Sequence, residues 1–483
     1  MSQETVCPTP LNVFKGPNAL QDFFDPDRNP PLPLVEIPME LNPLHKDGVR
    51  IFAKILTQLP AQNVKSLPAL RMLRNEPEAH RQKIVEASSG STVLSLGMVS
   101  RALWGHKDVH AFVTNKKDTS SLRLLRFFGL NVNLYGGLAQ QEPYDPKSIM
   151  SRLKARADQN RELCYPGQYH NEHNWKSHEQ WTGAQIWKQL PEIRVFCSTV
   201  GTGGCAVGTG IYLKRQNPSV KVVGVCNVMG DPTPGPRHFP NFESSPFPWQ
   251  ETIDAFEDVS SVDSYRTSMQ LSRHGIIAGP SSGEALHGLL AYLRRMKAEG
   301  RLPELADPST GEISCVFPCA DLPYQYMDTY YKKLAEEEFP PIRNKNLLYC
   351  DQDPYDERWF LQPEHAATMI SAHVFRPRPQ MQLLDLRPRD KYEESHIVGS
   401  RSIPLPATKA DLFGDAEAVE QRWTELTQAV REQEWSAGQR VLVLCADGDS
   451  ARMATAMLRA KGCEALCVEG GYPAMAGYFG REL

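Results

Sequence analysis

The segment Gln62-Asn63-Val64-Lys65-Ser66-Leu67-Pro68-Ala69-Leu70 marks a corner between a strand and a helix. The apolar run 49–56 before it is typical of a strand, residues 57–61 break that strand, and leucines spaced three apart after it predict a helix. A lysine at such a corner can be half buried, and burial favours its neutral, nucleophilic amine over the ammonium ion. For any single lysine a surface position at a helix start is the commoner situation, so the role of Lys65 depends on residues further along the chain.

The length and the charge balance indicate several globular domains without a strongly charged partner. A chain of 483 residues predicts two to four domains at about 150 residues each. Lys and Arg total 53 against 57 Asp and Glu, a net charge of -4, with no long block of one sign. We therefore expect neither nucleic acid nor a membrane surface as a partner.

Nothing in the first 25 residues resembles a secretory or transit signal, and no run reaches the ~18 apolar residues of a membrane span. The 11 cysteines include no CxxC pair, and their odd number in a chain without a signal indicates reduced thiols. We expect a cytoplasmic protein without a metal site.

Short apolar runs alternate with helical patterns over residues 32–339. Predicted strands include 50–54, 109–113, 131–135, 193–197, 220–225 and 313–317, and predicted helices include 93–103 and 121–128. This alternation predicts an α/β fold with parallel sheets, helices on both faces, and ligands at the carboxyl ends of the strands. Around this domain we expect an N-terminal arm (1–31), a linker (340–379) and a smaller α/β domain (380–483).

Two segments of the large domain have the features of anion-binding helix N-termini. The first, Ser88-Ser89-Gly90-Ser91-Thr92, suits a carboxylate, although such a segment alone is more often an ordinary N-cap. The second, Gly201-Thr202-Gly203-Gly204-Cys205, follows a predicted strand and opens a predicted helix, so its amides can hold a phosphate. A dinucleotide fingerprint would need an acidic residue at the end of the next strand, where Cys226-Asn227 stand, so we reject that interpretation.

A phosphate loop, a carboxylate loop and a lysine at a strand-helix corner together describe a pyridoxal phosphate site that handles an amino acid. Residues 32–335 resemble the cysteine synthase and cystathionine β-synthase family, the tryptophan-synthase-β type of pyridoxal phosphate enzymes. Five motifs stand in the family's order: Asn63-Val64-Lys65, Ser88–Thr92, Gln168-Tyr169, Gly201–Cys205 and Gly279-Pro280-Ser281-Ser282-Gly283. The resemblance implies the fold of that type, pyridoxal 5'-phosphate as cofactor, and a homodimer.

The resemblance also assigns roles to these motifs. Lys65 would carry the cofactor and act as the base at Cα. Ser88, Ser89, Gly90, Thr92 and Gln168 would bind the substrate, and Ser91, Gly201, Thr202, Gly203, Gly204, Cys205 and Ser281 the cofactor. A serine at the pyridine nitrogen, unlike a carboxylate, does not hold a proton there, so elimination and replacement at Cβ are favoured over transamination.

Three departures from the family affect the expected substrate. Ser91 replaces an asparagine that contacts cofactor and substrate, and Cys205 replaces a threonine of the phosphate loop. Residues 239–244 replace a glycine-rich segment that lets substrate approach closely. Because these residues are bulky and acidic, we expect a changed substrate space.

Residues 380–483 resemble a single rhodanese domain, with landmarks at Asp385-Leu386-Arg387, Tyr392 to Ser400, Cys445 to Gly448 and Val468 to Gly471. Cys445 lies between a predicted strand and a predicted helix, where amides stabilise a thiolate that would carry a persulfide. A buried strand-end cysteine is the alternative. Asp447 and Asp449 stand where the family's loop usually carries arginines, so we expect them to repel thiosulfate and to raise the thiol pKa.

Three functions are compatible with these residues. The first is β-replacement on an activated serine, such as O-acetylserine, with sulfur to form cysteine or a related amino acid, Cys445 supplying or accepting sulfane sulfur. The second is β-elimination, as in a cysteine desulfhydrase. The third is a non-catalytic sulfur sensor, motivated by Ser91 and the acidic loop. The partners would be a small amino acid and a sulfur donor.

Overall fold

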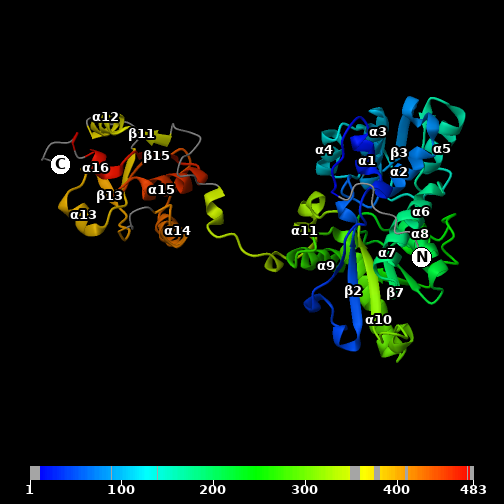
Figure 1. Ribbon diagram of the computed structural model, residues 1–483. Coiled ribbons are helices and arrows are strands. Elements are labelled where there is room, and N and C mark those ends of the chain that lie inside the picture. Colours follow the sequence, from blue (N-terminus) through cyan, green and yellow to red (C-terminus); the bar gives the residue numbers. More distant parts are fainter. Residues whose placement is uncertain are drawn as a thin grey trace. The chain divides into compact units, whose positions relative to one another are not determined.

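The computed structural model describes residues 11–478 except 89, 139, 349–358, 375–380, 408–411 and 476. The chain forms two compact units that meet in sequence between Glu338 and Phe339 (Figure 1). In the described part of the chain, no helix has both the length and the apolar character needed to cross a membrane.

The large unit contains two sheets. The six-stranded sheet has the spatial order β1 (Leu34–Glu36), β2 (Val49–Ile55), β10 (Ile313–Cys319), β7 (Ile193–Thr199), β8 (Lys221–Asn227) and β9 (Ala255–Val259). The four-stranded sheet has the order β5 (Asn131–Tyr135), β4 (Val109–Thr114), β3 (Lys83–Ala87) and β6 (Leu163–Cys164). Every pair is parallel except β1 with β2. The strands predicted from the sequence are present. Which strand belongs to which of the two sheets is known only from the structure.

The helices of the large unit are α1 (Ala19–Phe24), α2 (Ser66–Arg74), α3 (Ser91–Trp104), α4 (Thr119–Phe127), α5 (Ile149–Gln159), α6 (His173–Ser177), α7 (Ala184–Gln189), α8 (Gly204–Gln216), α9 (Ser261–Arg273), α10 (Pro280–Ala298) and α11 (Met327–Lys333). A π-helical segment, η6 (His178–Gly183), joins α6 to α7. Both faces of the larger sheet are buried: Val195 and Cys197 of β7 join the core formed with α9 and α10, and Phe196 between them joins the opposite core with α2 and α8. This explains why its strands are nearly continuous apolar runs.

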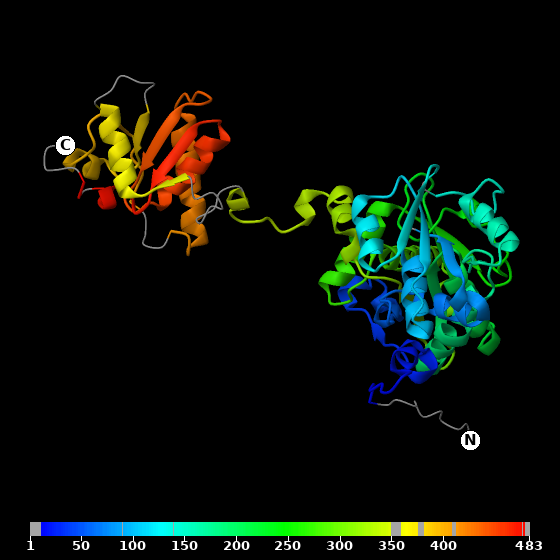
Figure 2. The same ribbon diagram turned by 90° about the horizontal axis from the view of Figure 1, so that it is seen from above.

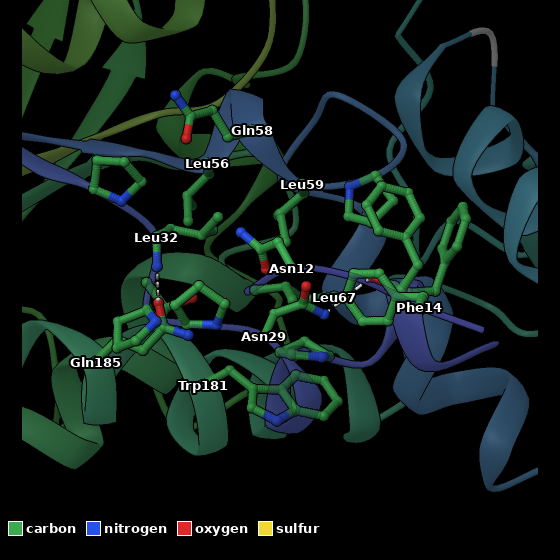
Figure 3. Close-up of a pocket in the computed structure, with 18 residues that line it drawn as sticks. Asn12, Phe14, Asn29, Leu32, Leu56, Gln58, Leu59, Leu67, Trp181 and Gln185 are labelled. Carbon is green, nitrogen blue, oxygen red and sulfur yellow. Dashed lines mark hydrogen bonds between the residues drawn. The ribbon is translucent and has the colours of Figure 1, made fainter. Parts of the chain in front are cut away.

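Residues 11–31 lie on the large unit, as expected of an arm. Asp25 forms an ion pair with Arg74 at 2.9 Å, and Trp181 Nε1 donates to Asp27 Oδ1 at 2.9 Å. Beneath the arm is a cavity of about 430 Å³ lined by apolar side chains such as Phe14, Leu67 and Trp181, with a few amides (Figure 3). Among the residues that the structure describes, no titratable side chain lines it.

The small unit has one parallel sheet in the order β11 (Phe360–Leu361), β15 (Glu464–Val468), β14 (Arg440–Leu444), β12 (Gln382–Asp385) and β13 (Ser400–Ser402). Its helices are α12 (Pro363–Val374), α13 (Arg389–Glu394), α14 (Ala416–Arg431), α15 (Asp449–Ala460) and α16 (Gly471–Met475). Helix α12 covers one face of the sheet, and α14 and α15 cover the other (Figure 2). Leu383 faces the core on the α12 side, and Leu384 faces the core on the side of α14 and α15. This follows from the alternation of side chains along a strand.

Strand β11 and helix α12 lie within the residues 340–379 that we expected to be a linker. Phe360 and Leu361 pair with Cys467 and Val468 of β15, and Ile370 of α12 is buried in the core of the small unit. The small unit therefore starts before residue 380, whereas residues 349–358 and 375–380 lie outside the described part of the chain.

Helix α8 approaches the α6-η6 segment closely because α8 has glycines on that side. A Cβ atom on Gly208 would lie 1.9 Å from the carbonyl oxygen of Trp175, and one on Gly204 would lie 2.1 Å from Asn174 Oδ1. The close approach places Asn174 so that its Nδ2 donates to Thr202 Oγ1 at 3.0 Å and to the Gln168 carbonyl at 2.7 Å. One buried amide thus connects two of the segments that the sequence singled out.

We predict that Gly208→Ala lowers the free energy of unfolding by about 1 kcal/mol. Overpacking against backbone costs about 1–3 kcal/mol, and here it exceeds the gain of about 1 kcal/mol from replacing a helical glycine. Chemical denaturation of the large unit measures the change. Gly136→Ala is the control, since nothing lies within 4 Å of its added Cβ, and there we expect a change within about 0.5 kcal/mol. An unchanged stability in Gly208→Ala would contradict the packing described.

Candidate active site

A cavity of about 480 Å³ lies at the carboxyl ends of the strands of both sheets in the large unit. It is lined by residues that follow β2, β3, β4, β5, β7, β8 and β10. The site residues predicted from the sequence that line it are Lys65, Ser88, Gly90, Ser91, Thr92, Gln168, Gly201, Thr202, Cys205 and Ser281. Gly203 and Gly204 lie in the same loop behind the lining, and Ser89 lies outside the described residues.

Lys65 sits at the N-terminus of α2, at the corner that the sequence predicts. The loop before it is fixed because Val64 N donates to the Ala320 carbonyl at 2.7 Å and Lys65 N donates to Asn63 Oδ1 at 2.9 Å. Burial lowers the pKa of the Lys65 amine, while the nearby Cys205 and Asp321 act in the opposite direction. Burial therefore shifts the equilibrium toward the neutral amine, the form that nucleophilic chemistry needs.

The Ser88–Thr92 loop joins β3 to α3 and lies over a buried acid. Thr92 Oγ1 donates to Gln168 Oε1 at 2.6 Å, which connects the loop to the second predicted substrate residue. Below it, Glu86 is fully buried and its Oε2 accepts from Gly167 N at 3.0 Å. Burial raises the pKa of Glu86 to about 7.

The Gly201–Cys205 loop joins β7 to α8 and needs two of its glycines for its shape. Gly203 has φ +84°, and a Cβ on Gly201 would lie 2.5 Å from the Gly235 carbonyl oxygen. The first turn of α8 presents backbone N–H groups that a helix leaves without internal partners, which suits an anion. Burial raises the pKa of the Cys205 thiol, so this side chain contributes no negative charge to the loop.

Ser281 lies in the first turn of α10 beside an acid that the sequence did not reveal. Asp321 follows β10, and a Cβ on Gly279 would lie 2.3 Å from its Oδ1. Asp321 Oδ2 accepts from Gln325 Nε2 at 3.0 Å and from the Tyr326 hydroxyl at 2.5 Å, whereas its buried Oδ1 has no partner among the described residues. Burial raises the pKa of Asp321 to about 6, against the effect of those hydrogen bonds.

The segment 239–244 does not shape the cavity, contrary to the sequence prediction. None of its residues lines the cavity, and Glu243 is exposed. Phe242 instead packs behind the phosphate loop, where a Cβ on Gly203 would lie 2.5 Å from its ring, and it joins Phe239, Trp249 and Phe256 in an aromatic cluster. The bulky residues therefore support the loop from behind and do not line the cavity.

In the small unit, Cys445 directly follows β14 and faces the start of α15. Its Sγ accepts from Gly448 N at 3.0 Å and Ala451 N at 3.3 Å, as expected. The residue is only 2% exposed. Burial raises the pKa of the Cys445 thiol to about 12, and the Asp447 carboxylate adds to that rise, so the thiol is neutral near pH 7.

Comparison with known proteins agrees with this geometry. Residues 29–303 match the family described as pyridoxal-phosphate dependent enzyme, and residues 370–477 match the rhodanese-like domain. The chain belongs to the pyridoxal-phosphate dependent enzyme family. Its cofactor is therefore pyridoxal phosphate, and its C-terminal part is a rhodanese-like domain.

The relatives of this enzyme include two curated synthases. Cysteine synthase of Aquifex aeolicus (strain VF5) is 30% identical over 295 residues, 59% of this chain and 85% of that protein. N-(2-amino-2-carboxyethyl)-L-glutamate synthase of Cupriavidus metallidurans is 28% identical over 299 residues, 58% of this chain and 82% of that protein. Among solved structures, O-acetyl serine sulfhydrylase isoform 3 of Entamoeba histolytica has a TM-score of 0.52 at 22% identity, covering 68% of this chain and 95% of that one, which shows the shared fold.

The chemistry of the cavity fits the cofactor. It offers a half-buried amine, a helix N-terminus free of acidic side chains in its first turn, and a buried carboxyl oxygen without a partner among the described residues. The amine matches the aldehyde carbon of pyridoxal phosphate, the helix N-terminus matches its phosphate, and the carboxyl oxygen matches a polar ring atom.

We predict that Glu86→Gln flattens the pH dependence of stability. A carboxyl whose pKa is raised in the folded state stabilises the fold fully below its unfolded pKa of about 4.5 and loses that contribution as the pH rises through about 7. Between pH 5 and pH 8 the unfolding free energy of the wild type should therefore fall by up to about 3 kcal/mol relative to the variant. Denaturant titrations at several pH values measure this difference, and parallel curves would contradict the buried, protonated state of Glu86.

We predict that Asp447→Asn makes the Cys445 thiol more reactive. Removing the carboxylate charge lowers the thiol pKa by about 0.5–1 unit, which raises the rate of iodoacetamide alkylation at pH 8 roughly three- to tenfold. Mass spectrometry identifies the labelled cysteine, and Cys445→Ser defines the background. Asp390→Asn, on the exposed helix α13, should leave the rate unchanged. Equal alkylation rates in wild type and Asp447→Asn would show that Asp447 does not raise the pKa of the Cys445 thiol.

Proposed function

We propose that the large domain catalyses β-replacement on an activated L-serine, such as O-acetylserine, with a sulfur nucleophile, forming cysteine or a related amino acid. The observation that carries this proposal is that Lys65, the Ser88–Thr92 loop, the Gly201–Cys205 loop and Ser281 meet in one cavity. Similarity to cysteine synthases supports the class of reaction.

The role that we propose for each residue follows from its surroundings in the cavity. Pyridoxal phosphate, when bound, withdraws electrons from Cα of the amino acid. The neutral amine of Lys65 attaches the cofactor and accepts the Cα proton, because burial lowers its pKa. The loop amides and hydroxyls of Ser88–Thr92 bind the α-carboxylate, and Gln168 holds Thr92 in place.

The Gly201–Cys205 loop and the N-terminus of α8 hold the phosphate, and Asn174 fixes the loop through Thr202. Ser281 and Asp321 occupy the same wall of the cavity, at the start of α10 and the end of β10. Asp321, protonated in part near pH 6, can donate a hydrogen bond to a polar ring atom in addition to Ser281.

For the rhodanese-like domain we propose a role as carrier of sulfane sulfur. The observation that favours it is that two backbone amides donate to Cys445 Sγ, which stabilises negative charge on sulfur. The carboxylate of Asp447 disfavours an anionic donor such as thiosulfate but tolerates a persulfide presented by a protein, whose outer sulfur would bond to Cys445 Sγ while the donor leaves as a thiol.

We predict that Lys65→Ala abolishes the visible absorbance of the bound cofactor and lowers turnover at least roughly 1000-fold, since removing the nucleophile and base leaves only binding contributions. Activated serine is supplied with and without sulfide, and cysteine and pyruvate are quantified: cysteine indicates replacement and pyruvate indicates elimination. Lys297→Ala, which removes a surface ion pair with Asp47, should retain absorbance and activity. An undiminished band in Lys65→Ala would place the attachment site at another lysine.

A further inference from the structure

Arg237 is a buried cation that lines the same cavity as Lys65 and Ser281. Only 7% of the residue is exposed. Its guanidinium donates from Nε at 3.1 Å and from Nη2 at 2.8 Å to the Tyr169 hydroxyl, and from Nη1 at 2.8 Å to the Gln141 carbonyl. It also stacks on the Tyr169 ring, with Cζ 4.8 Å from the centroid. All of these partners are neutral.

Arg237 forms no ion pair with any residue that the structure describes. Glu142 follows Gln141 in the chain; its Oε2 accepts from Tyr144 N at 2.9 Å, and its buried Oε1 has no hydrogen-bond partner among the described residues, Arg237 included. Of the other buried arginines, Arg387 pairs with Asp385 at 2.7 Å and Arg422 with Glu425 at 3.1 Å. Arg194 also has no ion pair among the described residues, but it donates to the Leu305 carbonyl and does not line the cavity. Burying a charge without a counter-ion costs free energy. We therefore expect an anion from outside the chain to pair with Arg237.

The backbone around Arg237 is held firmly at the mouth of the phosphate loop. Arg237 N donates to the Val200 carbonyl at 2.9 Å, and its own carbonyl accepts from Asn227 N at 3.0 Å. Asn227 Nδ2 donates in addition to the Pro236 carbonyl at 2.8 Å. The asparagine that ends β8 therefore positions this arginine.

The side chain of Arg237 points away from that loop, toward the substrate side. Its contacts Gln141 and Tyr169 belong to the segments after β5 and β6, and Tyr169 adjoins Gln168, which holds the carboxylate loop through Thr92. A guanidinium has five N–H groups, of which three make the contacts described. Two remain, enough for a bidentate contact to an oxyanion.

We propose that Arg237, supported by Tyr169, forms a subsite for an oxyanion that a substrate carries in addition to its α-carboxylate. This inference rests on the proposed function and specifies the substrate class. The oxyanion is a phosphate or a carboxylate, carried either by the leaving group of the activated serine or by the nucleophile.

The test uses the cofactor-loaded full-length protein and compares wild type with Arg237→Gln. In the first arm, O-phospho-L-serine and O-acetyl-L-serine are each supplied with sulfide. In the second arm, L-glutamate and L-glutamine are each supplied as nucleophile with O-acetyl-L-serine. We expect kcat/KM for the anionic member of one pair, relative to its neutral counterpart, to fall roughly 10- to 100-fold in Arg237→Gln. The arm that responds identifies which substrate carries the oxyanion.

Arg215→Gln is the matched control. Arg215 also stacks on a tyrosine, with Cζ 5.1 Å from the Tyr212 centroid, but it pairs with Glu179 and does not line the cavity. Its variant should leave both ratios unchanged. Tyr169→Phe removes the acceptor that orients the guanidinium, and we expect a smaller fall in the same ratio.

Calorimetric binding of O-phospho-L-serine and of L-glutamate, without a second substrate, provides a readout that does not depend on turnover. If no activated serine is turned over, the proposed function fails, and this binding comparison alone decides the inference. The inference is overturned if the wild type prefers neither anionic probe, or if Arg237→Gln weakens anionic and neutral probes equally. Loss of cofactor absorbance in Arg237→Gln would also overturn it, because the guanidinium would then serve the cofactor phosphate.

Discussion

The active site depends on two adjacent residues that follow β10. The carbonyl of Ala320 accepts from Val64 N at 2.7 Å, which fixes the corner that carries Lys65, and the carbonyl of Asp321 accepts from Gly279 N at 2.8 Å, which fixes the start of α10. Ala320 N donates in turn to Ser282 Oγ at 3.0 Å. Because β10 is central in the larger sheet, these bonds position the amine and the serine against a rigid support.

Burial acts in the same sense on four ionisable groups that line this cavity or lie beneath it. It lowers the pKa of Lys65 and raises the pKa of Cys205, Asp321 and Glu86, so each group is pushed toward its uncharged form. An amine that must act as a nucleophile and a base benefits from this environment. A guanidinium cannot follow the same route, since it is always protonated, and this is why the lack of a counter-ion at Arg237 carries information about the substrate.

The sequence was sufficient for the parts of the site that are local. Lys65, the Ser88–Thr92 loop and the Gly201–Cys205 loop each lie where a predicted strand gives way to a helix, and the structure brings them to one cavity. Asp321 could have been suspected, as an acid just after a predicted strand in a parallel sheet. Arg237 gave no signal, because its position follows from the backbone bonds to Val200 and Asn227.

Two expectations failed for tertiary reasons. Residues 239–244 occupy the place of a substrate segment in sequence, but aromatic packing with Trp249 and Phe256 draws them behind the phosphate loop. Strand β11 and helix α12 are hidden in sequence between proline-rich stretches, and β11 has only two residues. Its pairing with β15 is a contact more than a hundred residues away in sequence, which no local pattern reveals.

The two units use one local design for opposite purposes. In each, a strand of a parallel sheet leads through a glycine with positive φ, Gly203 at +84° or Gly448 at +104°, into a helix whose first amides face the strand end. At α8 the first turn has no acidic residue, so the amides attract an external anion. At α15, Asp447 Oδ1 already accepts from Asp449 N at 3.0 Å, so a carboxylate of the chain occupies this position. The small unit thereby keeps the amides that face Cys445 while placing a carboxylate beside them, which disfavours the approach of a free anion.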